Sequence, residues 1–182
     1  MKKYGIYLMM FALLCTTSCK DDKDDHRERW MMDNISAYNA IKTDPEYKEL
    51  KSPGNEGSIY YKVLKESGGT DSIYYTSAIS CYYKGWLIAD YPKLNFKKGH
   101  IFDQTLFDDG APAPFNVRIL NAGWKTALQH MVKGDKWEIW IPYQLGYGRY
   151  DNTDGYGNVT IPGYSTLVFE VEIVDIIGIE GK

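Results

Sequence analysis

The chain has 182 residues, which is enough for one domain of ordinary size with additional segments, since domains commonly have about 100–200 residues. Its hydrophobic fraction of 44% and aromatic fraction of 15% can supply a packed core, which excludes a chain that is disordered throughout. The net charge of −3 argues against a nucleic-acid partner, because proteins that bind nucleic acid present a basic face.

The N-terminus has the order of parts of an export signal. Lys2 and Lys3 precede an apolar stretch from Tyr4 to Leu14, which small and polar residues follow. The stretch is too short to cross a bilayer, which takes about 20 apolar residues. We therefore expect residues 1–18 to be a signal peptide. The alternative, a buried core helix, would leave the two lysines and the later charged run without a purpose.

The end of this signal is similar to a bacterial lipobox, in which a cysteine becomes the lipidated first residue. The matching segment is Thr16-Thr17-Ser18-Cys19, and it departs from the pattern at Thr16, where leucine is usual. The run Lys20–Asp25 is a solvated tether, and it also resembles the signal that sends some Bacteroidetes lipoproteins to the cell surface. These resemblances imply an outer-membrane lipoprotein anchored through Cys19, either periplasmic or surface-exposed.

Only Cys81 then remains in the mature chain, so an intramolecular disulfide is impossible and the domain depends on its core alone. Cys81 lies within the apolar run Ser77–Ile88, which predicts a small core residue rather than a nucleophile.

Residues 19–57 are predicted to be an acidic tether with a helical extension. Met31, Ile35 and Tyr38 have the spacing of one helix face. Pro45 and the Ser52-Pro53-Gly54 break limit this helix. Because a single helix cannot bury its apolar stripe alone, we expect it to dock on the domain or on another copy of the chain.

From residue 58 to 178 the pattern predicts strands and one short helix. The strands alternate apolar and polar side chains or are rich in β-branched and aromatic residues. They are Ile59–Lys65, Ser77–Ile88, Lys136–Pro142 and Leu167–Ile176. Only Trp124–Val132 has helical spacing here. We therefore predict an α+β domain whose antiparallel sheet curls around one short helix.

Five short motifs follow one another in this domain. They are Tyr83-Lys84-Gly85-Trp86-Leu87, Phe102-Asp103-Gln104-Thr105, Gly123-Trp124 with Leu128, Met131 and Gly134, Ile141-Pro142 with Tyr147-Gly148, and Ile161-Pro162 with Ser165-Thr166-Leu167-Val168-Phe169 and Glu172. In this order they resemble the FKBP-type peptidyl-prolyl cis-trans isomerases, over about Ile59 to Ile177.

The resemblance implies an isomerase with an aromatic pocket for proline. It assigns catalytic roles to Tyr83, Phe102, Asp103, Trp124, Tyr147 and Phe169, and substrate contacts to Phe115, Leu120, Asn121 and Ile161. The partners that it implies are Xaa-Pro segments of exported proteins and macrolide immunosuppressants of the FKBP-ligand type. Any one of these aromatic rings could instead pack the core.

No cofactor or metal is expected, because rotation about a prolyl bond needs neither. The segment Asp151–Gly155 lacks the ligand spacing of a calcium loop. The three histidines, His26, His100 and His130, are scattered without the spacing of metal ligands.

Three departures from the family pattern put the substrate range, and to a lesser extent the rate, in question. Extra residues lie between Leu87 and Phe102, where a tight turn is usual. Asn121 stands where isoleucine is usual. The segment Arg149–Thr160 is longer and is expected to overhang the site. The alternative function is therefore a catalytically weak FKBP-like module that binds a peptide or a surface glycan.

Overall fold

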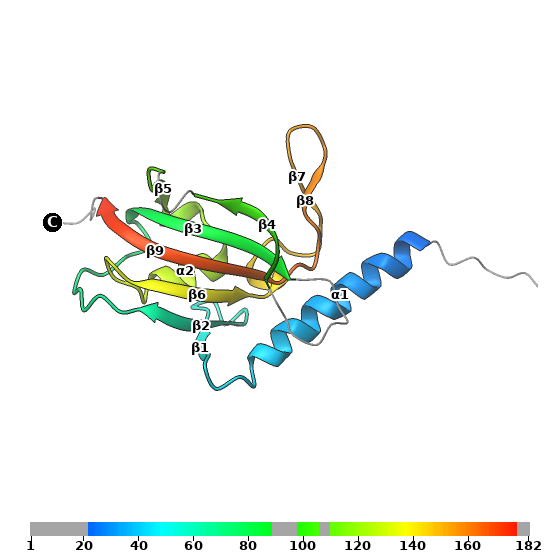
Figure 1. Cartoon of the computed structure of the whole chain (residues 1–182), viewed down its shortest axis with the longest axis horizontal. Coiled ribbons are helices and arrows are strands. Elements are labelled where there is room, and N and C mark those ends of the chain that lie inside the picture. The colour runs from blue at the N-terminus through cyan, green and yellow to red at the C-terminus, as the bar shows by residue number, and fades with distance from the viewer. Residues whose placement is uncertain (1–21, 89–97, 106–109, 178–182) are drawn as a thin grey trace, which may run out of the picture.

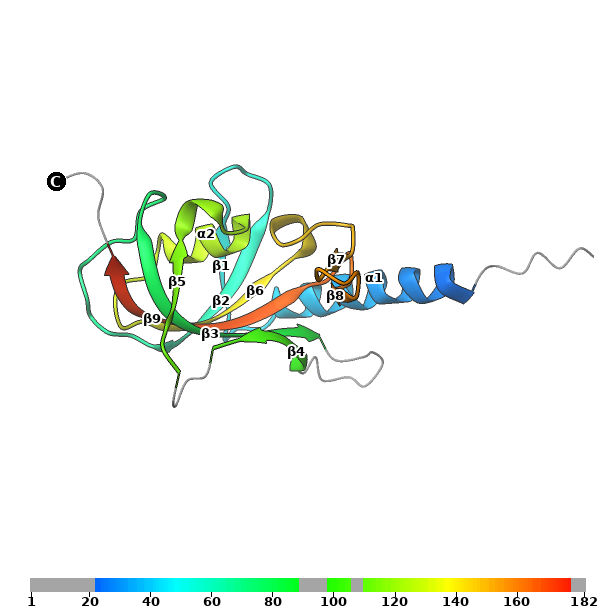
Figure 2. The same cartoon turned by 90° about the horizontal axis from the view of Figure 1, so that it is seen from above.

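The computed structural model describes residues 22–88, 98–105 and 110–177. A curved antiparallel sheet holds a short helix on its concave side, and a longer N-terminal helix lies on the other side (Figure 1, Figure 2). The α+β fold class predicted from the sequence is confirmed. The helices are α1 (Asp22–Ile41) and α2 (Ala122–Leu128), with the short 3-10 helices η1 (Val117–Ile119) and η2 (Tyr143–Leu145).

The main sheet has seven strands, with six in the order β1-β2-β6-β9-β3-β4 and β5 paired to β3 beside β4. They are β1 (Lys48–Lys51), β2 (Ser58–Lys65), β3 (Ala78–Ile88), β4 (Lys98–Gln104), β5 (Ala113–Asn116), β6 (Lys136–Ile141) and β9 (Leu167–Ile177), and β7 (Asn152–Thr153) and β8 (Val159–Ile161) form a separate hairpin. The central strands β3 and β9 pair along almost their whole length. This pairing holds Gly85 opposite Phe169, a register that matters for the site.

Alternation along the strands gives the sheet two apolar faces. Ile139, Ile141 and Leu167 belong to the main core around α2, whereas their neighbours Trp140 and Val168 belong to a second cluster. Successive strand side chains point to opposite faces, so the second cluster lies on the face away from α2. The sheet is therefore buried on both sides over part of its area.

The helix α1 covers this second cluster. Ala37 and Ile41 are buried there, and Trp30 and Tyr38 pack against it. The helical extension thus docks on its own domain, one of the two arrangements expected from the sequence. No helix in the described ranges combines the length and the apolar character that crossing a membrane requires.

The end of the extension differs from the prediction, because Lys48–Lys51 joins the sheet as the edge strand β1 instead of belonging to the helical extension. Leu50 is its only apolar residue and pairs with Ile59. A four-residue, mostly charged segment has too little alternation to reveal a strand in the sequence. The sheet therefore begins before residue 58.

The domain helix also ends earlier than expected, at Leu128 rather than Val132. The amides of His130 and Met131 donate to the carbonyls three residues before them, which tightens the last turn. The apolar face predicted for this segment holds nevertheless, since Trp124, Ala127, Leu128 and Met131 are all buried.

Cys81 should react slowly with a thiol reagent in the folded protein. It is fully buried in β3, and burial raises the pKa of its thiol to about 12. The reactive thiolate is therefore scarce as well as inaccessible. Labelling followed by mass spectrometry, with and without denaturant, measures this. Rapid labelling of the folded protein would contradict the placement of Cys81.

Candidate active site

A cavity of about 160 Å³ opens between β3, β4, β5, η1, α2 and β9 and is called the site cavity below. Its lining is mostly aromatic, with two polar side chains. The lining residues are Tyr83, Phe102, Asp103, Phe115, Ile119, Leu120, Asn121, Trp124, Tyr147 and Phe169. The structure thus brings together all the predicted pocket residues except Ile161, while their roles in binding and catalysis stay predictions.

The floor of the site cavity is Trp124, which lies in the first turn of α2 and is 4% exposed. Three aromatic rings surround its indole. The ring centroids of Phe169, Tyr83 and Phe115 lie 5.1, 5.8 and 5.9 Å from that of Trp124. The Tyr83 and Phe169 contacts are edge to face and the Phe115 contact is tilted. Such contacts fix ring orientation, because they favour defined angles as well as burial. The cavity is therefore shaped before any ligand enters.

The structure gives a reason for asparagine, in place of the usual isoleucine, at position 121. It is the N-cap of α2, and its side-chain oxygen accepts a hydrogen bond from the backbone N–H of Trp124 at 2.9 Å. Asparagine is among the best residues at this position. The substitution exchanges an apolar contact for a cap that holds the helix bearing Trp124. Among the described residues, none accepts a hydrogen bond from the backbone N–H of Asn121, so this donor can serve a ligand.

Tyr83 and Asp103 form the polar side of the cavity. The Tyr83 hydroxyl donates to Asp103 Oδ2 at 2.7 Å. Burial, and then the hydrogen bond to this carboxylate, raises the pKa of Tyr83 above its usual range. Thr105 fixes the register of the two strands, because its N–H donates to the Tyr83 carbonyl and its hydroxyl accepts from the Tyr83 N–H, both at 2.9 Å. The Phe-Asp-x-Thr motif thus aligns the carboxylate with the phenol.

Gly85 makes room for two cavity walls. A Cβ at this position would lie 2.6 Å from Cε1 of Phe169 and 2.7 Å from Cζ of Phe102. These two rings meet edge to face, with centroids 5.4 Å apart. The glycine of the Tyr-x-Gly-x-Leu motif is therefore required by space, since any side chain would push both rings from their places.

Tyr147 lies at the rim of the site cavity and is 47% exposed. Partial burial, followed by the charge of Asp103, raises the pKa of Tyr147. Its hydroxyl is a hydrogen-bond donor at the rim and can donate to a bound carbonyl.

Two expectations for the surroundings of the cavity are not met. Ile161 is buried in the core and does not line the cavity. No residue of the segment Arg149–Thr160 lines the cavity; the segment forms the β7–β8 hairpin, which projects from the domain (Figure 1). The Asp154 carboxylate closes this hairpin by accepting from the amides of Tyr156 and Asn158.

Ile119 is a lining residue that sequence reasoning missed. It ends η1 and is 76% exposed. The only feature of the sequence that could have identified Ile119 as a lining residue is its position, one residue before Leu120. In the described ranges, no group of three His, Cys, Asp or Glu side chains gathers in the manner of metal ligands.

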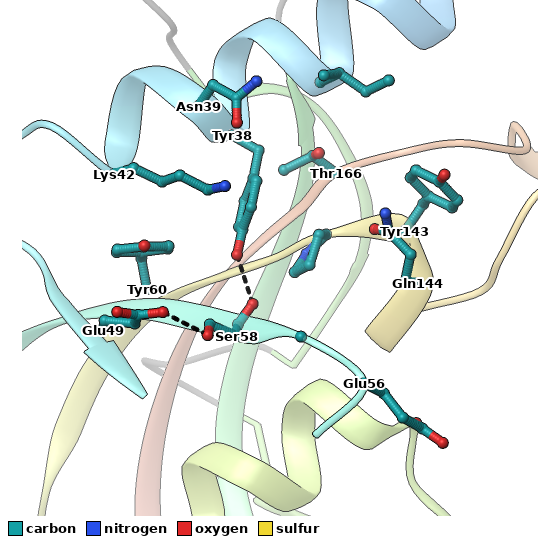
Figure 3. A pocket seen from close by; sticks show the side chains of 13 residues that line it. Tyr38, Asn39, Lys42, Glu49, Glu56, Ser58, Tyr60, Tyr143, Gln144 and Thr166 are labelled. Atoms are coloured by element: carbon teal, nitrogen blue, oxygen red, sulfur yellow. Dashed lines mark hydrogen bonds between the residues drawn. The ribbon is translucent and has the colours of Figure 1, made fainter. Parts of the chain in front are cut away.

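A larger hollow of about 350 Å³ lies elsewhere, between α1 and the sheet (Figure 3). We call it the helix hollow. Tyr38, Tyr60, Tyr143 and Gln144 are among its lining residues. Its size does not make it the better candidate, because the smaller site cavity gathers the aromatic rings and the oriented polar pair that the sequence motifs mark.

Comparison with known proteins shows similarity to one family. The family model described as "FKBP-type peptidyl-prolyl cis-trans isomerase" matches residues 72–174. The "FKBP-type 22 kDa peptidyl-prolyl cis-trans isomerase" of Escherichia coli is 45% identical over 83 residues, which cover 43% of this chain and 38% of that protein. "Outer membrane protein MIP" of Legionella longbeachae is 34% identical over 82 residues, which cover 43% of this chain and 33% of that protein.

A crystal structure of a peptidyl-prolyl cis-trans isomerase from Pseudomonas syringae pv. tomato superposes with a TM-score of 0.64 at 27% identity. The match covers 83% of this chain and 96% of that one. By contrast, the matched segment spans between 33% and 38% of the length of the two curated relatives.

Proposed function

Since the chain belongs to the FKBP-type peptidyl-prolyl cis-trans isomerase family, we propose that its domain catalyses cis/trans exchange at Xaa-Pro bonds of exported proteins. The observation that carries this proposal is the site cavity. The Phe169 ring contacts the rings of both Phe102 and Trp124 there, and Asp103 also lines the cavity. Small-molecule sites of this kind combine apolar walls with a few placed polar groups.

The reaction sets simple demands on these residues. Amide resonance imposes a barrier of about 18–20 kcal/mol on rotation about the prolyl bond. No covalent bond forms or breaks, so the enzyme must only bind the twisted amide better than either planar form. The aromatic rings hold the proline ring and exclude water, which disfavours the polar planar amide. The residues that we propose for these walls are Tyr83, Phe102, Phe115, Trp124 and Phe169.

The polar groups orient the peptide around that ring. The Tyr147 hydroxyl and the backbone N–H of Asn121 are donors at the cavity, and each can donate a hydrogen bond to a peptide carbonyl. Asp103 accepts a hydrogen bond from the Tyr83 hydroxyl. We propose that its carboxylate also interacts with the twisted prolyl amide. Leu120 and Ile119 border the entrance and can contact the residue before proline, so we expect a preference for an apolar residue there.

An exchange assay on a Xaa-Pro peptide tests the proposal. The purified protein is expected to accelerate cis/trans exchange above the uncatalysed rate, whose time constant is about 10–100 s. Asp103→Ala and Tyr147→Phe are each expected to lower kcat/KM by about tenfold, equivalent to about 1.4 kcal/mol of transition-state stabilisation. Circular dichroism must show that each variant is folded.

The opposite result is equally clear. A folded wild-type protein with no rate above background would overturn the isomerase and favour the peptide- or glycan-binding module. If both substitutions leave kcat/KM unchanged, catalysis takes place outside the site cavity. A macrolide of the FKBP-ligand type should compete with the peptide, because we propose that it occupies the same aromatic walls.

We also propose an envelope location. One relative is named an outer membrane protein, and the N-terminal sequence has the order of a lipoprotein signal. Cys19, the proposed lipidation site, lies outside the described residues. The anchor places the domain at the outer membrane, on the periplasmic or the surface side.

Cys19→Ala should release the protein from the membrane fraction, because the proposed lipid is its attachment to the bilayer. Fractionation of cells and immunoblotting measure this, and Cys15→Ala is the matched control that should leave the protein in the membrane. Unchanged partitioning of the Cys19 variant would overturn the lipobox assignment.

A further inference from the structure

Tyr147 has a glycine on each side, so its position depends on the hydrogen bonds and packing of the surrounding loop. Tyr147 lies between Gly146 and Gly148, and Gly148 has a φ of +80° with open space where a Cβ would be. Glycine adopts such conformations readily but is correspondingly free to leave them. The position of the Tyr147 ring at the cavity therefore depends on contacts made by the chain on either side.

An inner set of contacts closes this loop on itself. The Gly148 N–H donates to the Tyr143 carbonyl at 2.8 Å, and the Tyr164 N–H donates to the Gly148 carbonyl at 2.9 Å. The rings of Tyr143 and Tyr164 meet with centroids 5.1 Å apart. Tyr164 has a φ of +64°, a conformation that a bulky residue keeps only when its surroundings impose it.

Part of those surroundings is α1. Arg27 Nη2 donates to the Arg149 carbonyl at 2.9 Å, two residues after Tyr147. The Arg27 guanidinium also lies 6.0 Å from the centroid of the Tyr164 ring. One side chain of the N-terminal helix thus touches both ends of the segment that contains the β7–β8 hairpin.

A second contact lies seven residues along α1, which is two turns and therefore the same face of the helix. Asn34 is fully buried, and its side-chain oxygen accepts from the Thr166 N–H at 2.6 Å. The Thr166 hydroxyl donates to the Asn34 carbonyl at 3.0 Å. Thr166 is also buried and lies beneath α1 beside the helix hollow (Figure 3). Without Asn34 the Thr166 amide would be left buried and unpaired, which is costly.

We propose that α1 is a positioning element of the active site, in which Arg27 and Asn34 hold residues 149–166 and thereby keep Tyr147 at the site cavity. This inference rests on the proposed isomerase function for its kinetic consequence. It gives the N-terminal extension a role in catalysis, in addition to joining a domain to its anchor. Arg27 and Asn34 touch no substrate and act through Tyr164, Thr166 and the loop between them.

The test uses two single variants, each with a control on the same helix, and the double variant that combines them. Arg27→Ala is matched by Arg29→Ala, because Arg29 is an exposed arginine whose ion pair with Asp25 stays within α1. Asn34→Ala is matched by Asn39→Ala, an exposed asparagine on the same helix. Thr166→Val removes the hydroxyl bond to α1, and Thr166→Ser keeps it.

We expect faster amide hydrogen exchange at residues 146–150 in Arg27→Ala and Asn34→Ala, and unchanged exchange there in both controls. We expect kcat/KM of the double variant to fall by about tenfold, since small displacements of a positioned group have effects of this order. The KM should rise by more than kcat falls, because Tyr147 is lost as a binding contact. Thr166→Ser should retain wild-type kinetics and Thr166→Val should not.

Unchanged exchange at residues 146–150 in a folded Arg27→Ala/Asn34→Ala protein would overturn the inference. So would a double variant that melts earlier but keeps the wild-type KM, which is the behaviour of a purely structural contact. If Asn34→Ala does not fold, amide exchange and KM can still be measured on Arg27→Ala, because Arg27 is exposed. If the wild-type protein has no isomerase activity, the proposed function fails, while the exchange pattern still decides whether α1 holds the loop.

Discussion

Phe102→Ala is expected to lower kcat/KM by at least about tenfold, a loss of about 1.4 kcal/mol or more of transition-state stabilisation. Phe102 is a wall of the site cavity and meets the Phe169 ring edge to face. Truncation removes a contact with the proline ring and lets water reach the amide. The peptide exchange assay measures the rate, with substrate varied so that kcat and KM are separated.

The experiment must distinguish the loss of a substrate contact at Phe102 from a loss of stability of the whole domain. Removing a large ring from a core can itself cost about 3–5 kcal/mol of unfolding free energy, so a denaturation curve accompanies each rate. Tyr156→Ala is the control, because Tyr156 is 95% exposed on the β7–β8 hairpin and lines no part of the cavity. A folded Phe102 variant with the wild-type rate would remove Phe102 from the site.

Gly85→Ala is expected to lower the unfolding free energy by about 1–3 kcal/mol, the usual cost of overfilling a packed core. Its new methyl group would lie within 2.7 Å of atoms in Phe102 and Phe169. Because both rings are cavity walls, peptide exchange should slow as well. Chemical denaturation and the exchange assay measure the two effects on the same preparation.

Gly155→Ala is the matched control for this substitution. Its added methyl would meet no atom within 4 Å, at the tip of the β7–β8 hairpin. It changes the same chemical group without crowding, so stability and rate should stay near those of the wild type. If Gly85→Ala behaves like Gly155→Ala, the rings of the cavity are not held as tightly as the structure implies.

The sequence predicted well those features that repeat along the chain. The long strands β3 and β9 alternate or are uniformly apolar, and the buried face of α2 recurs at helical spacing, so both were found. The burial of Cys81 followed from its strand. The aromatic residues of the site cavity came together because their motifs occupy fixed positions on those same elements.

Features set by single contacts between distant segments could not be read in this way. Nothing periodic distinguishes Asn34 from other polar residues of α1, yet its partner is Thr166, one residue before β9. Similarly, Asn121 looked like a lost apolar contact, and only the geometry shows it as the cap of α2. Residues 149–160 were expected to overhang the site, but they form the β7–β8 hairpin and none of them lines the cavity.

The short, charged strand β1 has a consequence for how copies of this protein behave beside one another. An outer strand offers unpaired amides and carbonyls on which another chain could add a strand. Lys48, Glu49 and Lys51 are exposed on β1, and its four residues give an incoming strand little length to pair with. At the opposite border, the pairing of β3 with β4 is interrupted by two register shifts that break the regular edge. Both borders of the sheet thus discourage edge-to-edge aggregation, which matters for a protein proposed to work among unfolded chains.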